Sequence, residues 1–158
     1  MNSIQVKSAL ADHAFLAGLA ESDIMTLATL AFEVHFQEEQ IIFREGDASS
    51  FFYLIQSGHI VLELLAPGHI LRIETIGEGD ELGWSSLLTS VNKQFQARCL
   101  EPVTAFAFDG AQIIARCEDD PGFGFRLLRR VLATVADRLR ATRLQMVDVY
   151  AKRGSGGQ

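Results

Sequence analysis

The chain has 158 residues, 48% of them hydrophobic and 22% charged, with a formal net charge of −6. This is the size of one domain with an added element, and the hydrophobic content excludes disorder over most of the chain. No apolar run approaches the roughly 18–20 residues that cross a bilayer, and Cys99 and Cys117 are too few for a disulfide framework. The sequence therefore predicts a cytoplasmic protein with no membrane contact.

The charge is unevenly distributed along the chain. Residues 1–120 contain eighteen acidic and six basic residues (−12), whereas residues 121–158 contain two acidic and eight basic residues (+6). The acidic part is unsuited to nucleic acid, because neutralising phosphates needs clustered cations. The basic part either solvates one face of a helix or meets an acidic partner surface or a bound phosphate.

Residues 1–30 are expected to form short helices. Ser22 is the expected N-cap of one of them, and Ile24, Leu27 and Ala28 follow it at helical spacing. From residue 31 to residue 108 the pattern changes to short β-branched and aromatic runs separated by glycines, which is typical of a sandwich or barrel. Pro67-Gly68 lies between two such runs and predicts a hairpin turn.

Residues 109–151 are expected to be helical again, followed by a flexible tail at 152–158. Asp109 is a candidate N-cap, and Asp120-Pro121 places proline at a helix start, where its missing N–H costs nothing. Nothing interrupts the last helix before about Tyr150. Along it, apolar residues and one threonine follow a heptad pattern: Leu128, Leu132, Val135, Leu139, Thr142, Met146 and Val149. This pattern predicts a homodimer formed through the C-terminal helix.

Four short stretches in the middle of the chain resemble a known family. They are Glu45-Gly46-Asp47, Phe52-Tyr53-Leu54-Ile55, Ser57-Gly58-His59-Ile60 and Gly79-Asp80-Glu81-Leu82-Gly83. Together they resemble the β-roll of cyclic-nucleotide-binding domains, which are the sensor domains of CRP/FNR regulators, nucleotide-dependent kinases and gated channels. The resemblance implies a mainly β fold with α elements, a double-stranded β-helix or jelly roll flanked by N-terminal helices and a long C-terminal dimerisation helix.

The resemblance also implies a ligand site and its residues. In the family, a short helix written Phe/Leu-Gly-Glu-x-Ala-Leu-Leu holds the cyclic phosphate with backbone N–H groups, an Arg pairs with that phosphate, and the Glu accepts from the ribose. The corresponding helix is expected near residues 84–89. The implied ligand is cyclic AMP or cyclic GMP, and the implied ligand-binding residues are Gly83, Trp84, Ser85, Ser86, Leu87, Lys93, Gln94, Arg98 and Thr142.

This sequence departs from the family pattern at the two charged positions. Trp84 stands in place of the ribose-binding Glu, and an indole has no acceptor for a hydroxyl proton. The Arg position falls on Lys93 or Gln94, and Arg98 on the return strand is a candidate substitute. Losing two charge-assisted contacts would weaken binding by about two to four decades. Trp84 either plugs a disused pocket, stacks on a purine, or lines a site for a more apolar ligand.

The leading hypothesis is a stand-alone regulatory module that signals through a partner protein, with altered or lost ligand binding. The alternatives are a functional cyclic AMP or cyclic GMP receptor that uses Lys93, Arg98 and Trp84, a haem or apolar-ligand sensor, and an interaction scaffold. The scattered histidines form no catalytic motif, so no enzyme is expected. The sequence leaves too few residues after the long helix for a recognition helix, so direct DNA binding is not expected either.

Overall fold

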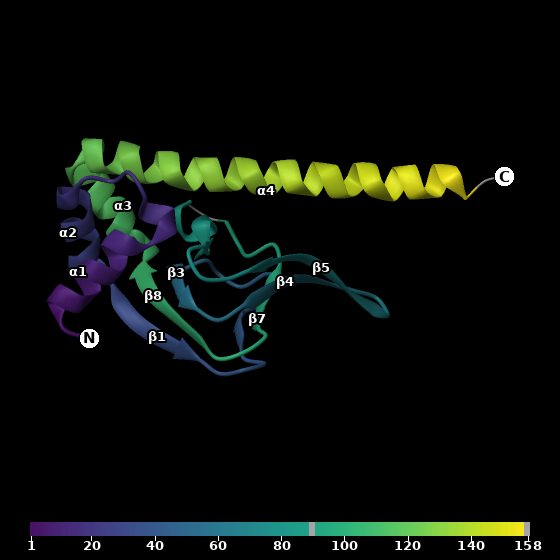
Figure 1. The fold of residues 1–158 in the computed structure, drawn as a ribbon, viewed down its shortest axis with the longest axis horizontal. Coiled ribbons are helices and arrows are strands. Elements are labelled where there is room, and N and C mark those ends of the chain that lie inside the picture. The colour runs from purple at the N-terminus through teal and green to yellow at the C-terminus, as the bar shows by residue number, and fades with distance from the viewer. Residues whose placement is uncertain (89–90, 157–158) are drawn as a thin grey trace.

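The computed structural model describes residues 1–88 and 91–156. Two four-stranded antiparallel sheets, here together called the roll, pack face to face, and helices cover one end (Figure 1). One sheet has the order β1-β8-β3-β6 and the other β2-β7-β4-β5. The strands are β1 Phe32–Phe36, β2 Ile41–Phe43, β3 Phe51–Ser57, β4 Ile60–Ala66, β5 His69–Ile76, β6 Glu81–Leu82, β7 Gln96–Cys99 and β8 Val103–Asp109. This architecture confirms the predicted fold class.

Two hydrophobic clusters form the core. One lies between the sheets and includes Ile55, Ile60 and Ala105 from β3, β4 and β8. The other lies between the β3–β8 side of the roll and the helices, and its largest fully buried side chains include Phe52 and Phe106. The two faces of β8 therefore pack in different clusters, Ala105 between the sheets and Phe106 against the helices. This explains why the strand is almost entirely buried.

Three short helical elements precede the roll: α1 Ser3–Asp12, the 3₁₀ turn η1 Ala14–Leu16 and α2 Glu21–Leu30. The expected cap at Ser22 is wrong, because α2 begins at Glu21 with Ala20 as its N-cap, two residues earlier. Ala20 has no polar side chain to satisfy the first amides. Instead, Glu21 and Asp23 in the first turn place negative charge at the positive end of the helix.

Helices α3 (Gly110–Asp119) and α4 (Pro121–Ser155) follow the roll. Asp109 caps α3 by accepting from the amide of Ala111, and Asp120 caps α4 by accepting from Phe123. Helix α4 continues five residues beyond the expected end at Tyr150 and extends past the body of the molecule (Figure 1). Residues 157–158 of the expected tail lie outside the described residues. Across residues 1–88 and 91–156, no helix is long and apolar enough to cross a membrane.

The Pro67-Gly68 turn joins β4 to β5, as the sequence predicts. Gly68 has φ +80°, a left-handed conformation that favours glycine. The hairpin extends on the same side of the molecule as the free length of α4 (Figure 1). Leu65, Ile70 and Leu71 near its tip are exposed, so both protruding elements present apolar side chains to solvent.

The start of α3 contacts the turn that follows β6 through a glycine. A Cβ at Gly110 would lie 2.3 Å from the backbone oxygen of Ser86, far inside any allowed contact. Because the obstacle is backbone rather than a flexible side chain, it cannot yield without moving the turn. Only glycine allows α3 to pack this closely, so the position of α3 depends on the segment around Ser86.

We expect Gly110→Ala to destabilise the fold by about 1–3 kcal/mol, the usual cost of overpacking. For a chain of this size that corresponds to a fall of about 2–12 °C in Tm. Differential scanning calorimetry measures it, with Gly154→Ala as the matched control, since a Cβ at Gly154 meets open space. Equal Tm values for the two variants would contradict the close contact at Ser86.

Candidate functional site

The site begins at Gly83, which turns the chain from β6 into the 3₁₀ helix η2 Trp84–Leu87. Gly83 has φ +86°, and a Cβ there would lie 2.5 Å from the oxygen of Phe51. Any side chain is thus excluded twice, by backbone conformation and by contact. The expected helix at 84–89 ends at Leu87 with Leu88 as its C-cap, and residue 89 lies outside the described residues.

The two serines of η2 are occupied by internal hydrogen bonds. Ser86 donates from its amide and from Oγ to the oxygen of Gly83, at 3.0 and 2.8 Å. Ser85 Oγ lies 2.6 Å from Ser49 Oγ. We call the set of Gly83, Ser85, Ser86 and Lys93 the cradle. Its turn is held by its own hydroxyls and needs no ligand to keep its shape.

The ammonium of Lys93 fills the interior of the cradle. Its Nζ donates to Ser85 Oγ at 3.3 Å and lies 4.3 Å from the ring centroid of Phe43, a cation–π contact. The side chain is buried, and burial lowers the pKa of Lys93 to about 8, although the nearby Glu81 carboxylate opposes the shift. One neutral hydroxyl and one ring replace the water shell of this amine, so keeping it charged is costly.

The remaining space is divided into two cavities. The one in the cradle measures about 20 Å³ and is lined by Phe43, Gly83, Trp84, Ser85, Lys93, Gln94 and Phe95. The other, which we call the helix-facing cavity, measures about 220 Å³ and lies between the roll and α4. Trp84 and Phe95 line both and form the wall between them. A ligand site usually offers about 300–1,000 Å³, whereas the cradle cavity holds roughly one water.

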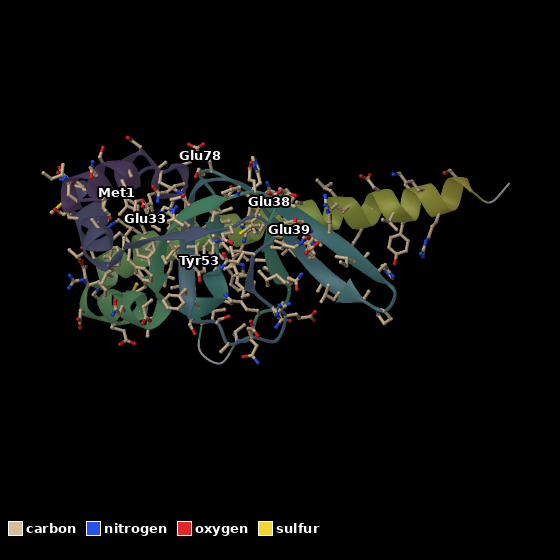
Figure 2. The ribbon with its side chains drawn as sticks, turned by 90° about the horizontal axis from the view of Figure 1, so that it is seen from below. Met1, Glu33, Glu38, Glu39, Tyr53 and Glu78 are labelled. Atoms are coloured by element: carbon tan, nitrogen blue, oxygen red, sulfur yellow. The ribbon has the colours of Figure 1, made fainter. Side chains whose placement is uncertain are left out.

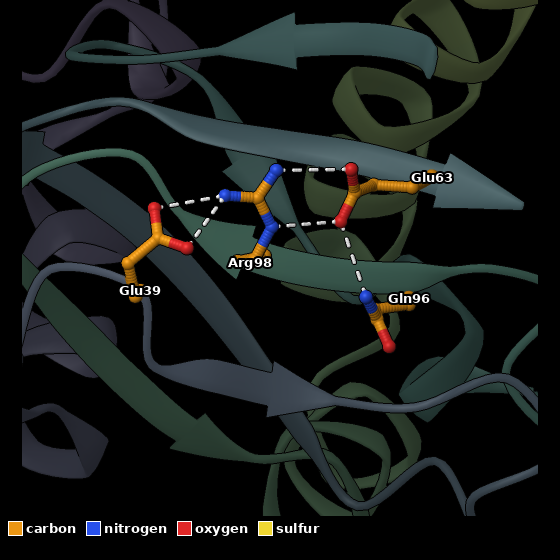
Figure 3. A network of polar contacts seen from close by, with 4 residues as sticks. All are labelled: Glu39, Glu63, Gln96 and Arg98. Atoms are coloured by element: carbon orange, nitrogen blue, oxygen red, sulfur yellow. Dashed lines mark hydrogen bonds and ion pairs between the residues drawn. The ribbon is translucent and has the colours of Figure 1, made fainter. Parts of the chain in front are cut away.

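Arg98 is placed away from the cradle and cannot substitute for the family arginine there. Figure 3 shows its guanidinium between two carboxylates, with Nε and Nη2 donating to Glu63 at 2.9 and 3.1 Å, and Nη1 donating to Glu39. Gln96 also donates to Glu63, at 3.1 Å. The bond from Arg98 lowers the pKa of Glu63. Residues 96 and 98 alternate to the same face of β7, and that face carries Glu63 rather than the cradle.

Thr142 lies on α4 and lines the helix-facing cavity, as the family resemblance implies. Its Oγ1 donates to the backbone oxygen of Arg138 at 3.0 Å, so its hydroxyl proton is already used. Gln94 lines the cradle cavity but is exposed, and its side chain donates to the oxygen of Asn92. Leu87 is buried in the helix-side core and contributes packing.

Sequence reasoning did not single out Arg138 and Glu81, which connect α4 to the roll beside the two cavities. Arg138 Nη1 lies 2.7 Å from Glu81 Oε1, Nη2 donates to the backbone oxygen of Glu81 at 2.8 Å, and Nε lies 3.1 Å from Glu74 Oε2. The contact to Glu81 Oε1 is an ion pair rather than a hydrogen bond, because neither carboxylate oxygen of Glu81 has a hydrogen-bond partner among the described residues. Arg138 stands one turn before Thr142 on the same helix face, and that spacing was the available signal.

Burial raises the pKa of Glu81 to about 7, and the charges of Asp80 and Glu74 act in the same direction. Arg138 and Lys93 oppose the shift. Glu81 stands two residues before Gly83, the first residue of the cradle. Its buried carboxylate lies near both the ammonium of Lys93 and the guanidinium of Arg138 from α4. The electrostatic state of the cradle and the attachment of α4 are therefore linked.

The arrangement offers no metal site in the part of the chain that the structure describes, where no three His, Cys, Asp or Glu residues gather around one point. Neither the cradle cavity nor the helix-facing cavity has a histidine among its lining residues. A haem placed in either would lack the histidine ligand that the alternative hypothesis requires.

Comparison with protein-family models matches residues 33–120 to the cyclic nucleotide-binding domain. The chain belongs to this family. A search of curated proteins by sequence found no match. Among solved structures, a cyclic nucleotide-binding domain from Methylobacillus flagellatus is similar, with 15% identity and a TM-score of 0.79 over 92% of this chain and 83% of that one.

Two further neighbours show how widely the fold is used. The catabolite activator protein of Thermus thermophilus has 22% identity and a TM-score of 0.72, over 87% of this chain and 63% of that one. The regulatory subunit of a cAMP-independent protein kinase A from Trypanosoma cruzi, solved with guanosine, has 21% identity and a TM-score of 0.61, over 85% and 53%. At these identities the likeness establishes the fold, and the ligand must be argued from the site.

Lys93→Met is expected to stabilise the protein at neutral pH. Folding lowers the pKa of Lys93 from 10.5 to about 8, so the folded state binds this proton more weakly than the unfolded chain. The contribution of the neutral amine is fully present above pH 10.5 and is lost as pH falls through about 8. At pH 7 the variant should gain about 2–3 kcal/mol in free energy of unfolding, and the gain should shrink above pH 8.

Urea unfolding between pH 6 and about 10 measures this difference. Lys152→Met, at an exposed position near the end of α4, is the control and should leave the free energy of unfolding unchanged. A Lys93→Met variant that is less stable than the parent at pH 7 would show that the ammonium is well solvated by partners, contrary to its burial.

Proposed function

We propose that this chain is a regulatory module of the cyclic nucleotide-binding family whose cradle is filled by its own side chains. In this proposal cyclic AMP and cyclic GMP bind weakly or not at all, the module works as a homodimer through α4, and it signals through a partner protein without catalysing a reaction. The observation that carries the proposal is the wall formed by Trp84 and Phe95, which closes a cavity of about 20 Å³ around the Lys93 ammonium.

The wall matters because a nucleotide needs both compartments at once. Its phosphate would have to reach Lys93 in the cradle while its base lay against α4 in the helix-facing cavity. Trp84 and Phe95 line both spaces, so their side chains would have to move before one ligand could occupy them. The loss of the ribose-binding carboxylate and of a bidentate cation leaves less binding energy to drive that movement.

A functional receptor is the second candidate, and one observation favours it. Among the described residues, the buried ammonium of Lys93 has a single hydrogen-bond acceptor, which destabilises the fold, and an anion next to Nζ would offset that cost. Trp84 would then stack on the base. The neighbour from Trypanosoma cruzi was solved bound to guanosine, a nucleoside without a phosphate, so uncharged nucleosides belong among the compounds to test.

Homodimerisation is supported by the exposure of the heptad residues on α4. Leu132 is 66% exposed and Leu139 is 54% exposed, and Met146 and Val149 are similarly open to solvent. The buried side chains of this helix, Phe123, Leu127 and Val131 among them, all lie in its first third. The rest of α4 carries an apolar stripe that its own chain covers only in part, since Val135 and Leu139 also line the helix-facing cavity, and a second copy presents a matching stripe.

Thermal-shift measurements with cyclic AMP, cyclic GMP and guanosine at about 1 mM test the ligand proposal. A ligand at 100 times its Kd would add about 2.7 kcal/mol and raise Tm by roughly 5–10 °C. We expect less than about 1 °C for the parent protein and a larger shift for Trp84→Glu, which opens the wall and restores a carboxylate. Tyr150→Glu, an exposed aromatic outside both cavities, is the control.

Two outcomes would favour the receptor instead. One is a clear shift of the parent protein with any of these compounds. The other is a shift that Trp84→Glu abolishes while Tyr150→Glu preserves it, because this result would assign Trp84 to base stacking.

Leu132→Glu is expected to prevent dimer formation, because it places a charge at the most exposed leucine of the stripe. Leu144→Glu is the matched control, since Leu144 is also exposed, at 62%, but lies on a different face of α4. Size-exclusion chromatography with light scattering should give a monomer for the first variant and a dimer for the second. A monomeric parent protein, or a dimer that survives Leu132→Glu, would contradict the role of the stripe.

A further inference from the structure

A hollow of about 290 Å³ lies at the helical end of the molecule, beside the first residues of the heptad stripe. It separates the loop at 17–19 from the first turns of α4 and is lined by Ala17, Gly18, Leu19, Phe125, Arg126, Arg129, Arg130 and Ala133. We call this set the arginine groove. A second hollow of about 320 Å³ shares the loop residues Ala17, Gly18 and Leu19, so the two are adjacent. Neither takes part in the cradle.

The groove presents guanidinium groups whose positions are fixed. Arg126 makes two bonds of 2.7 Å to the buried carboxylate of Asp23. Arg130 donates from Nε to the backbone oxygen of Phe15 at 2.8 Å. Arg129 lies over the ring of Phe125 at 5.8 Å and has no carboxylate partner among the described residues. Side chains held in this way lose little further entropy when they bind.

The groove is also positively charged in a chain that is acidic as a whole. Three arginines against the carboxylates of Asp23, which pairs with Arg126, and of Asp120, which lies near it, leave one net positive charge, because the carbonyl that holds Arg130 does not neutralise it. The opposite side of the molecule carries acidic side chains such as Glu33, Glu38 and Glu39 (Figure 2). An acidic partner is therefore drawn to this face and repelled from the other.

An exposed aromatic side chain completes the surface. Phe125 is 64% exposed, whereas Phe123, two residues earlier on the same helix, is fully buried. Arginine and aromatic residues beside a concave surface are the commonest anchors of protein interfaces. The adjacent hollow adds apolar lining from Leu16 and Ile24, with Lys7 and Glu21 paired at its rim.

We propose that the arginine groove binds an acidic peptide segment of a partner protein. Carboxylates of the segment pair with Arg129 and Arg130, and a neighbouring apolar side chain enters the hollow against Phe125. The concave shape and the fixed guanidinium groups favour a peptide over a flat lipid surface. The acidic remainder of the chain disfavours a nucleic acid. This inference rests on the proposed function only in requiring a partner protein, and it is independent of nucleotide binding.

Fluorescence anisotropy with a panel of labelled acidic peptides tests the proposal. Each peptide has about ten residues, about four of them Asp or Glu, with one Leu, Phe or Trp at a varied position. We expect at least one member to bind with a Kd of about 10–100 µM at low salt. Replacing its apolar residue with Ser, or introducing Arg129→Glu or Phe125→Ser into the protein, should weaken binding about tenfold or more.

Arg143→Glu is the matched control, since Arg143 is exposed on α4 outside the groove, and it should change Kd by less than about twofold. Equal weakening by Arg129→Glu and Arg143→Glu would overturn the proposal, because it would indicate general charge attraction. So would a panel in which no peptide binds below about 1 mM, or tighter binding to an oligonucleotide or to phosphatidylserine vesicles that Arg129→Glu abolishes.

The Tm with nucleotides and the mass in solution are measured on the same Arg129→Glu protein. Unchanged values show that the variant is folded and dimerises as the parent does. A nucleotide shift in both proteins would overturn the filled cradle while leaving the peptide result to stand or fall alone.

Discussion

The Arg138 guanidinium joins the long helix to the roll through a carboxylate and a backbone oxygen of the same residue, Glu81. Breaking such a buried pair by removing one partner usually costs about 3–5 kcal/mol, because the remaining charge is left without compensation. Glu81, Leu82 and Gly83 run directly into the cradle. The position of α4 and the shape of the cradle therefore both depend on the short strand β6. A displacement of α4 would move the cradle, and a displacement of the cradle would move α4.

The Lys93 ammonium also acts electrostatically on Glu81, outside the cradle cavity. Glu81 and Lys93 each hold the pKa of the other closer to its ordinary value, while burial shifts both toward the neutral form. Arg138 competes for the same carboxylate from the side of α4. An anion reaching Lys93 would relieve Glu81 of one of its two cations.

The sequence predicted the roll well because its signals are local. Glycines with a left-handed backbone, such as Gly68 and Gly83, mark turns that few other residues allow, and a two-residue period marks the strands between them. The failed cap at Ser22 and the late end of α4 are boundary errors. Helix ends depend on what the first and last turns contact, and single residues carry little of that information.

The candidate site was harder to predict because its decisive contacts join distant segments. Arg98 matches a strand position that could have served a phosphate, yet it pairs with Glu63, 35 residues earlier, and with Glu39 on a turn. The pair between Arg138 and Glu81 spans 57 residues. Comparison with the family's ligand-site motif identified Trp84 and Lys93 as departures from it. Only the fold shows that Trp84 and Phe95 together divide the space a nucleotide would need.

Trp84 is the only tryptophan in the chain, so its fluorescence reports directly on the wall between the two cavities. The most direct test of the filled cradle is its emission spectrum during titration with cyclic AMP and cyclic GMP up to about 1 mM. If the cradle is filled, we expect no saturable change in emission intensity or wavelength beyond that caused by matched additions of AMP. A saturable change with a cyclic nucleotide alone would mean that Trp84 yields to a ligand and that the cradle is a working receptor site.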